Sequence, residues 1–244
     1  FVTSRGFPKL LRNTLTLSLY SIATFPCAII FALMLNELRG ERFKRTVQTV
    51  TYIPHFISMV VICSIIRQFC LSDGVFNDIG AFFGAQRTAL LQKPGYFRTI
   101  YVASGIWQEI GWSSIIYLAA CILYIAGIAG IDRALYEAAE IDGANRLRQT
   151  WHITLPGIMP TIIMLLILRM GSILGVGYEK ILLLYNETIY ETADVISTYV
   201  YRKGLIEANF SYSTAVGLFN NVINIVLLLG ANAISRKVSQ TSLF

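Results

Sequence analysis

The chain has 244 residues, of which 55% are hydrophobic and only 14% are charged, and its mean hydropathy is +0.60. A soluble domain usually has about a quarter charged residues, so this composition excludes an ordinary water-soluble protein. The net charge of +6 comes from basic residues beside apolar stretches, as membrane topology requires. No basic run with interleaved aromatics indicates a nucleic-acid partner.

Five apolar segments are long enough to cross a lipid bilayer, since about twenty helical residues span its ~30 Å hydrocarbon core. Backbone groups in lipid must pair internally, and no alternating ten-residue pattern indicates a barrel, so the predicted fold is an all-α polytopic membrane protein. Pro26 and Pro54 fall within two of the segments, where neighbouring helices can accommodate kinks. In chain order, the predicted spans are residues 15–35, 50–66, 100–128, 158–176 and 215–234.

The charge of the short loops predicts the orientation of the spans. The connection between the first two spans is expected inside the cell, and alternation then places residues 67–98 and 177–213 outside and residues 129–157 inside. Five spans would leave the two termini on opposite sides, so we expect a sixth span that precedes Phe1. The basic residues of that first connection are Arg39, Arg42, Lys44 and Arg45.

The inner end of the third span is uncertain from the sequence because of a near-repeat. Residues 117–120 (YLAA) are echoed by residues 124–127 (YIAG) seven positions later. Seven residues make about two helical turns, so the echo would lengthen the helix and keep its face.

No pattern for catalysis or metal binding is present. The sequence lacks a GxxxxGK[ST] phosphate loop, an HExxH pair and a GxSxG elbow, so we expect no catalytic residue, no metal site and no ATP hydrolysis by this chain. His55 is expected to make a structural hydrogen bond. The cysteines lack CxxC spacing and are expected to be small buried hydrophobes: Cys27, Cys63, Cys70 and Cys121.

The inside segment of residues 135–156 has the pattern of a helix followed by a turn. Glutamate and alanine favour a short helix from residue 135, with Glu137 early in it, as the helix dipole prefers. Gly143 after Asp142 permits a sharp change of direction. Pro156 lies near the start of the next span, where proline is tolerated. These residues alone predict an amphipathic element at the inner membrane face, or a passive interfacial loop.

The spacing of this segment resembles the EAA loop of binding-protein-dependent ABC import permeases. Other stretches are similar to carbohydrate permeases of the maltose type, above all those for complex oligosaccharides that include uronates; they are residues 12–15, 43–56, 107–109 and 179–184. The EAA-like spacing is Glu137-Ala138-Ala139, three residues, Gly143, nine residues, Ile153, one residue and Leu155-Pro156.

The resemblance implies the transmembrane domain of a type I ABC importer in a bacterial cytoplasmic membrane. Two permeases, identical or related, would form the pathway, and two ATP-binding cassette subunits would bind ATP and Mg²⁺ inside the cell. A solute-binding protein would deliver an oligosaccharide from outside. The loop would couple the permease to the ATPase through Glu137, Ala138, Ala139, Asp142, Gly143, Ile153, Leu155 and Pro156.

Polar groups within the spans are candidates for the substrate pathway, because they are costly in lipid. Arg169 could pair with a carboxylate-bearing sugar, reach out of the lipid, or pair with Glu109 or Glu179. Gly171 and Gly175 beyond it have GxxxG spacing, which permits close helix contact. The amides of the last span could bind sugar hydroxyls or join helices. The pathway candidates are Gln108, Glu109, Arg169, Tyr178, Asn220 and Asn224.

Three further alternatives remain open at the level of the sequence. The outside segment 177–213 could contact the delivery protein or be a solvated loop; its polar residues include Asn186, Glu187, Glu191, Asp194 and Lys203. The permease could carry another solute, such as an amino acid or phosphate. A channel or membrane enzyme that works without an ATPase is the third possibility.

Overall fold

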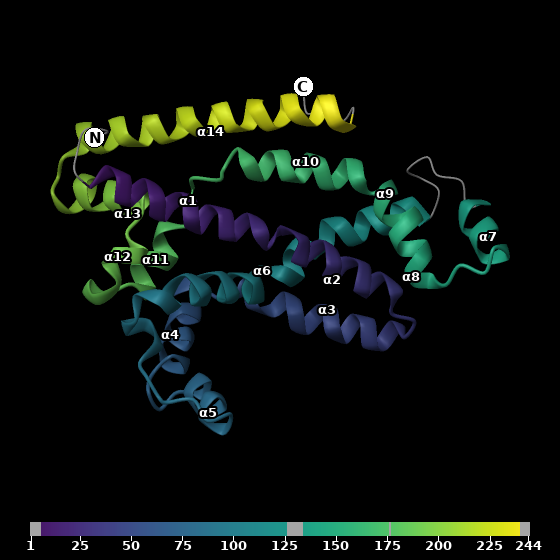
Figure 1. Ribbon diagram of the computed structural model, residues 1–244, viewed down its shortest axis with the longest axis horizontal. Coiled ribbons are helices and arrows are strands. Elements are labelled where there is room, and N and C mark those ends of the chain that lie inside the picture. Colours follow the sequence, from purple (N-terminus) through teal and green to yellow (C-terminus); the bar gives the residue numbers. More distant parts are fainter. Residues whose placement is uncertain (1–5, 126–133, 176, 240–244) are drawn as a thin grey trace. The chain divides into compact units, whose positions relative to one another are not determined.

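The protein is helical throughout the part of the chain that the computed structural model describes, residues 6–125, 134–175 and 177–239, where no strand occurs (Figure 1). The predicted all-α fold is therefore confirmed. Four short turns of other helical types are Leu90–Gln92, Thr150–Thr154, Glu187–Ile189 and Arg202–Ile206. The α-helices are α1 (Phe7–Ala23), α2 (Phe25–Glu37), α3 (Glu41–Phe56), α4 (Met59–Phe69), α5 (Val75–Phe82), α6 (Pro94–Ile125), α7 (Ala134–Ile141), α8 (Arg146–Gln149), α9 (Leu155–Gly157), α10 (Met159–Met170), α11 (Tyr178–Leu184), α12 (Tyr190–Ala193), α13 (Ile196–Tyr201) and α14 (Phe210–Ser239).

Up to five helical segments are long and apolar enough to cross a membrane. Three qualify alone: Phe7–Glu37, Pro94–Leu123 and Phe210–Lys237. Two bent pairs qualify together, Glu41–Phe56 with Met59–Phe69 and Arg146–Gly157 with Met159–Met170. They follow the chain order of the predicted spans, whose membrane boundaries remain predictions. The predicted ends at residues 128 and 176, and residues 126 and 127 of the near-repeat, lie outside the described residues.

A break divides the second predicted span, residues 50–66. Helix α3 ends there at Phe56 and α4 begins at Met59. The proline ring of Pro54 removes one backbone donor from the last turn of α3. Ser58 then has an extended backbone, and its hydroxyl accepts the amide N–H of Val61 at 3.4 Å, which caps α4. The chain therefore restarts a helix within this predicted span.

Contacts divide the chain into two compact units, which are described separately. The first unit comprises the described parts of residues 1–23, 56–106 and 172–225. Within it, α11 packs against α4, and α12 and α13 pack against α1 (Figure 1). The main core of this unit joins side chains of α1, α4, α6 and α11, among them Leu17, Ile62, Ile66, Phe97, Ile181 and Leu184.

The segment of residues 177–213, which is predicted to lie outside, is largely helical and contains α11, α12 and α13. The Asn186 amide donates to the Leu91 carbonyl at 3.1 Å. Both carboxylate oxygens of Asp194 accept hydrogen bonds from Arg202 at 2.7 Å. These hydrogen bonds raise the pKa of Arg202 above its ordinary value, so its charge persists. The solvated-loop interpretation is wrong for these two residues, because Asn186 is bound to Leu91, far away in the chain, and Asp194 is bound to Arg202, eight positions away.

The second unit comprises the described parts of residues 24–55, 107–171 and 226–244. Helices α3 and α6 approach closely within it, because a Cβ on Gly111 would clash with the Thr51 carbonyl oxygen. Gly111 therefore lets the two backbones touch. The core of this unit joins α2, α6 and α10, and includes Ala28, Ala32, Leu35, Tyr117, Leu118, Cys121, Ile158 and Ile162.

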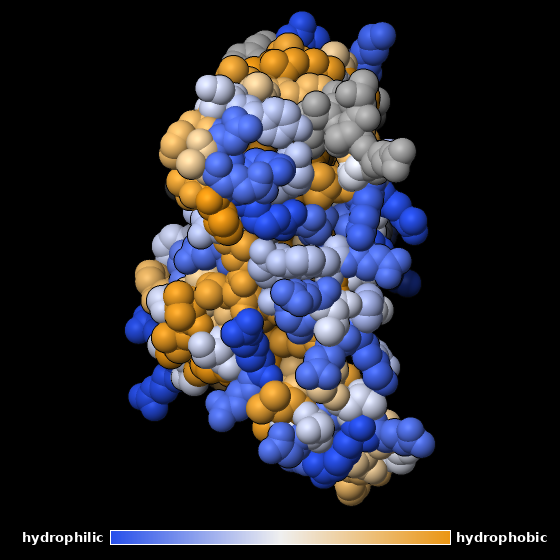
Figure 2. Space-filling model, turned by 90° about the vertical axis from the view of Figure 1, so that its left-hand side faces the viewer, coloured by the Kyte–Doolittle hydropathy of each residue, from blue (hydrophilic) through white to orange (hydrophobic). Residues whose placement is uncertain are grey.

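Large apolar side chains cover much of the surface of both units. In α14, only 6% of the most apolar stretch is buried. Figure 2 shows such side chains as orange areas among blue polar ones on one face. A water-soluble monomer rarely exposes apolar area on this scale, so these surfaces fit contact with lipid or other subunits. As expected, Cys63, Cys70 and Cys121 are buried and all four cysteines are free thiols.

Candidate functional site

The predicted coupling loop begins with α7, whose end is fixed by backbone hydrogen bonds alone. Gly143 has a positive φ of 74°. Its N–H donates to the Glu140 carbonyl at 3.0 Å, and the Ala144 N–H donates to the Ala139 carbonyl at 2.8 Å. This pair of bonds is a Schellman motif, which satisfies the last carbonyls of a helix and needs a left-handed residue at this position. The predicted turn at Gly143 is confirmed.

The chain restarts as a helix immediately after this turn. The Asn145 side-chain oxygen accepts the N–H of Arg148 at 2.9 Å and caps α8. Residues Thr150–Thr154 then form a π-helical turn, which leads into α9 with Pro156 in its first turn. Pi-helical turns are rare and occur often at functional sites. The loop is thus a run of short helical segments joined by the turn at Gly143.

Side-chain contacts join this loop to Glu37 of its own unit and join two parts of the loop to each other. The Thr150 hydroxyl donates to the Glu37 carboxylate at 2.8 Å, which ties the loop to the end of α2. The Tyr136 and Thr154 hydroxyls lie 2.8 Å apart and join α7 to the π turn. Arg146 lies 3.8 Å from the same Glu37 carboxylate. A movement of the loop would therefore be passed directly to α2.

The outer surface of the loop is open to contact. Glu137, Ala138 and Asp142 are exposed. So are three large apolar side chains, Ile141, Leu147 and Trp151, at 86%, 76% and 65%. A surface of acidic, small and apolar side chains on a rigid backbone is suited to a protein cleft.

The remaining predicted loop residues contribute to packing more than to this open surface. Ile153 and Leu155 are half-buried against the core of the second unit. Ala139 is half-buried as well, and Pro156 is exposed. The structure therefore divides the predicted set into an outer surface and an inner anchor.

Three pathway candidates lie in the second unit. Gln108 is 5% exposed on α6. The Glu109 carboxylate lies 3.0 Å from Nδ1 of His55, whose ring stacks on Trp112 with centroids 4.5 Å apart. The structural hydrogen bond expected for His55 is therefore confirmed. No local pattern in the sequence pairs Glu109 with His55, because the two residues are 54 positions apart.

Arg169 lies nearer to a helix end than the sequence indicates. Helix α10 ends at Met170, so Arg169 is in its last turn and is exposed. A cation there is favoured by the helix dipole. Gly171 follows immediately, and a Cβ on it would clash with the side chain of Leu228. Gly175 lies in the turn beyond α10, so the GxxxG spacing does not mark one continuous helix face.

The other three pathway candidates lie in the first unit. Tyr178 is 49% exposed, and its ring stacks with that of Tyr201, with centroids 5.9 Å apart. The Asn224 side-chain oxygen accepts the Leu174 N–H at 3.2 Å, which favours the structural role for this amide. The buried side-chain oxygen of Asn220 has no hydrogen-bond partner among the described residues, so its role stays a prediction.

A match to a known family covers most of the chain. Residues 24–240 match the family described as binding-protein-dependent transport system inner membrane component. The chain belongs to this family. It is a permease subunit of an ABC importer and not an enzyme, and it has the type I transmembrane fold that the EAA-like spacing implies.

Characterised relatives and solved structures resemble the permease over nearly its full length. It is 44% identical over 244 residues to the polygalacturonan/rhamnogalacturonan transport system permease protein YteP of Bacillus subtilis (strain 168). This match covers 99% of this chain and 74% of YteP. Protein LplB of the same strain is 44% identical over 246 residues, covering 100% and 75%. A chain of the bacterial alginate ABC transporter, in complex with an alginate pentasaccharide-bound periplasmic protein, superimposes with a TM-score of 0.90 at 46% identity and covers 99% of this chain and 82% of that one.

One buried cation of the permease has no signal in the sequence. Lys180 of α11 is 5% exposed; its ammonium donates to the Tyr101 carbonyl at 3.2 Å and lies 5.1 Å from the centre of the Tyr101 ring. Its surroundings come from α6, far away in the chain. Among the described residues, no group of three or more His, Cys, Asp or Glu side chains could hold a metal ion.

Proposed function

We propose that the permease forms part of the transmembrane pathway of an ATP-driven importer for acidic, uronate-containing oligosaccharides. It would work in a bacterial cytoplasmic membrane with a second permease, identical or related, and with two ATP-binding cassette subunits that bind ATP and Mg²⁺. A solute-binding protein outside the cell would deliver the substrate. The related alginate transporter, crystallised with its periplasmic protein, supports this assembly.

The coupling loop carries the mechanistic part of the proposal. Its helix α7 presents an exposed surface around Glu137 and Ile141, while Thr150 and Glu37 tie its base to α2. Closure of an ATPase pair around ATP would move this surface. Because Thr150 is hydrogen-bonded to Glu37 at the end of α2, displacement of the loop would reach α2 and bias the pathway between two states.

The chemistry of the named relatives supports an acidic cargo. Polygalacturonan and alginate are polymers of uronic acids, and their carboxylates need cationic or hydrogen-bonding partners. Arg169 offers a guanidinium at the end of α10. The unpartnered Asn220 oxygen can accept from a sugar hydroxyl, and the half-exposed Tyr178 ring can cover an apolar sugar face. We assign these three residues to substrate contact.

Uptake by the assembled transporter tests the proposal. The permease would be purified by an affinity tag, its co-purifying subunits identified, and the complex reconstituted in liposomes with its solute-binding protein. ATP-dependent uptake of a labelled oligogalacturonide is expected, with a neutral malto-oligosaccharide of equal length as the control substrate. Uptake of an amino acid or a neutral sugar alone would overturn the cargo assignment. Uptake by the permease without any ATPase subunit would overturn the coupling mechanism.

A further inference from the structure

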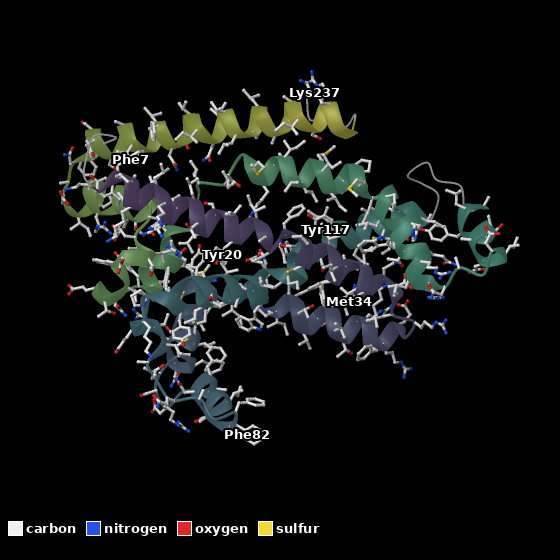
Figure 3. The ribbon with its side chains drawn as sticks, in the orientation of Figure 1. Phe7, Tyr20, Met34, Phe82, Tyr117 and Lys237 are labelled. Carbon is white, nitrogen blue, oxygen red and sulfur yellow. The ribbon has the colours of Figure 1, made fainter. Side chains whose placement is uncertain are left out.

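Helix α5 and the residue after it present an apolar face that the described residues of the chain leave exposed. The apolar side chains fall at relative positions 0, 1, 4, 7 and 8, the spacing of one helix face. Figure 3 labels Phe82 at the end of α5. The exposed fractions of the five side chains are 45% for Val75, 45% for Phe76, 55% for Ile79, 86% for Phe82 and 80% for Phe83.

The opposite face of α5 is fixed by buried hydrogen bonds. Asn77 is only 5% exposed. Its amide nitrogen donates to the carbonyls of Leu71 and Thr88 at 2.6 and 2.8 Å, and its oxygen accepts the Thr88 N–H at 2.9 Å. Arg87 and Asp78 form an ion pair at 2.7 Å beyond this anchor. The helix therefore cannot roll over to bury its phenylalanines, and their exposure is a fixed property of the fold.

The apolar face of α5 continues the exposed apolar surface of α4. The rings of Phe69, in the last turn of α4, and Phe76 pack edge to face with centroids 5.6 Å apart. Phe69 is itself 38% exposed, and Val60 and Val61 in the first turn of α4 are about half exposed. Exposed apolar side chains of α4, half of a bent candidate span, thus meet those of α5 at the Phe69–Phe76 contact.

We infer that α5 is an interfacial helix whose Val75–Phe83 face lies in the lipid bilayer, at the boundary between headgroups and acyl chains. A short helix with aromatic side chains on one face and polar side chains on the other has the composition of such membrane-surface helices. Phenylalanines at its end would reach toward the acyl chains, while Asp78 and Arg87 remain in water.

Lipid is the occupant that the observations favour. A solute-binding protein docks and leaves in every transport cycle, so its docking surface must tolerate water when vacant. Two phenylalanines that are at least 80% exposed would be a poor surface of that kind. Lipid is present at all times, and it is already the expected partner of the adjoining α4 surface. The helix then sets the depth at which the α4 end of the permease sits.

Spin-label accessibility in the reconstituted transporter tests this inference. The label is attached to Phe82→Cys in a permease whose four native cysteines are replaced, assembled with cysteine-free ATPase and partner subunits in phosphatidylcholine and phosphatidylglycerol liposomes. Gln86→Cys, at an exposed polar residue just past the helix, is the matched control. Oxygen partitions into lipid and a nickel chelate into water. We expect a severalfold higher oxygen-to-nickel collision ratio at residue 82 than at residue 86.

Each other outcome overturns the inference. A water-like ratio at residue 82 would mean that the face is exposed to solvent. Low accessibility to both reagents would mean that a second permease covers it. Loss of accessibility when the solute-binding protein is added would identify that protein as the occupant. The uptake assay on the same liposomes reports separately whether the proposed transport function holds.

Discussion

Helices α5 and α7 are built alike and present opposite chemistries. Each has eight residues and ends in the same pair of backbone hydrogen bonds around a glycine of positive φ, Gly84 at 84° and Gly143 at 74°. Helix α5 turns a face of phenylalanines outward, whereas α7 turns out glutamate and alanine together with Leu135 and Ile141. The same hydrogen-bonded turn therefore ends both helices, and the exposed side chains determine which partner each helix can bind.

The largest expected effect comes from the most exposed apolar residue of each helix, since Ile141 and Phe82 are both 86% exposed. If Ile141 enters an ATPase cleft, its burial contributes about 1.5–3 kcal/mol. Ile141→Ser should then weaken ATPase binding about tenfold to a hundredfold. Phe82→Ser should leave that affinity unchanged. Titration of the ATPase subunit onto permease in nanodiscs measures its affinity for both variants. An equal loss of affinity in the two variants would contradict the proposal that only α7 binds the ATPase.

The glycines that end α5 and α7, Gly84 and Gly143, provide a second comparison, with a smaller expected effect. No atom lies within 4 Å of a Cβ added at Gly84 or Gly143, so valine at either position causes backbone strain without a clash. Left-handed backbone costs about 1–2 kcal/mol for a residue other than glycine. Gly143→Val should lower substrate-stimulated ATP hydrolysis by up to about tenfold, whereas Gly84→Val should leave it intact.

The variant Gly143→Asn tests whether backbone strain, or the mere presence of a side chain, causes the loss of hydrolysis. Gly143→Asn should keep most of the hydrolysis, because asparagine tolerates the left-handed region. Unchanged hydrolysis in Gly143→Val, measured in proteoliposomes with binding protein and substrate, would contradict the coupling role of the turn.

The anchor of the coupling loop should have a moderate effect. Glu37→Ala removes the hydrogen bond from Thr150, which is worth about 0.5–1.5 kcal/mol. We expect fewer substrate molecules imported per ATP hydrolysed, with ATPase retention unchanged. Glu37→Gln should restore the ratio, since its amide oxygen still accepts from Thr150. The exposed Glu41, in the first turn of α3, gives the control variant Glu41→Ala. A normal import ratio in Glu37→Ala would show that motion bypasses α2.

The smallest effect is expected at the ion pair beside α5. Arg87 and Asp78 are each about half exposed, and such pairs contribute about 0–1 kcal/mol. Arg87→Ala should therefore leave the accessibility of a label at residue 82 unchanged. Asn77→Ala removes the buried anchor and should lower the oxygen-to-nickel ratio at that label. If Arg87→Ala had the larger effect, the orientation of α5 would depend on charge and not on the buried amide.

The sequence is sufficient for the parts of the fold that depend on neighbours in the chain. The alanine-rich stretch before Gly143 predicts both α7 and its turn, because helix propensity and a left-handed glycine act within a few residues. The apolar segments likewise indicate the helices, since hydrocarbon thickness sets their length. The EAA-like spacing then identifies the family.

Contacts between distant residues could not be predicted from the sequence. Glu37 and Thr150 are 113 positions apart, and no local pattern pairs them. Lys180 lies in an ordinary helical run, and its burial depends on α6. Pro54 indicates only a kink, whereas the structure ends α3 at Phe56 and starts a new helix at Met59. The polar residues Asn186 and Asp194 read as solvent-facing until their partners are known.

The π turn at Thr150–Thr154 has a consequence for how the chain tolerates changes in length. A π turn holds one residue more than an α-helical turn over the same rise. Deleting one residue here could be absorbed by closing the turn as α-helix, with little rotation of the helix that follows. The same deletion within α10 would rotate all later side chains by about 100°. The π turn thus holds one residue more than an α-helical turn needs. One residue can be deleted there while the side chains of α10 keep their orientation.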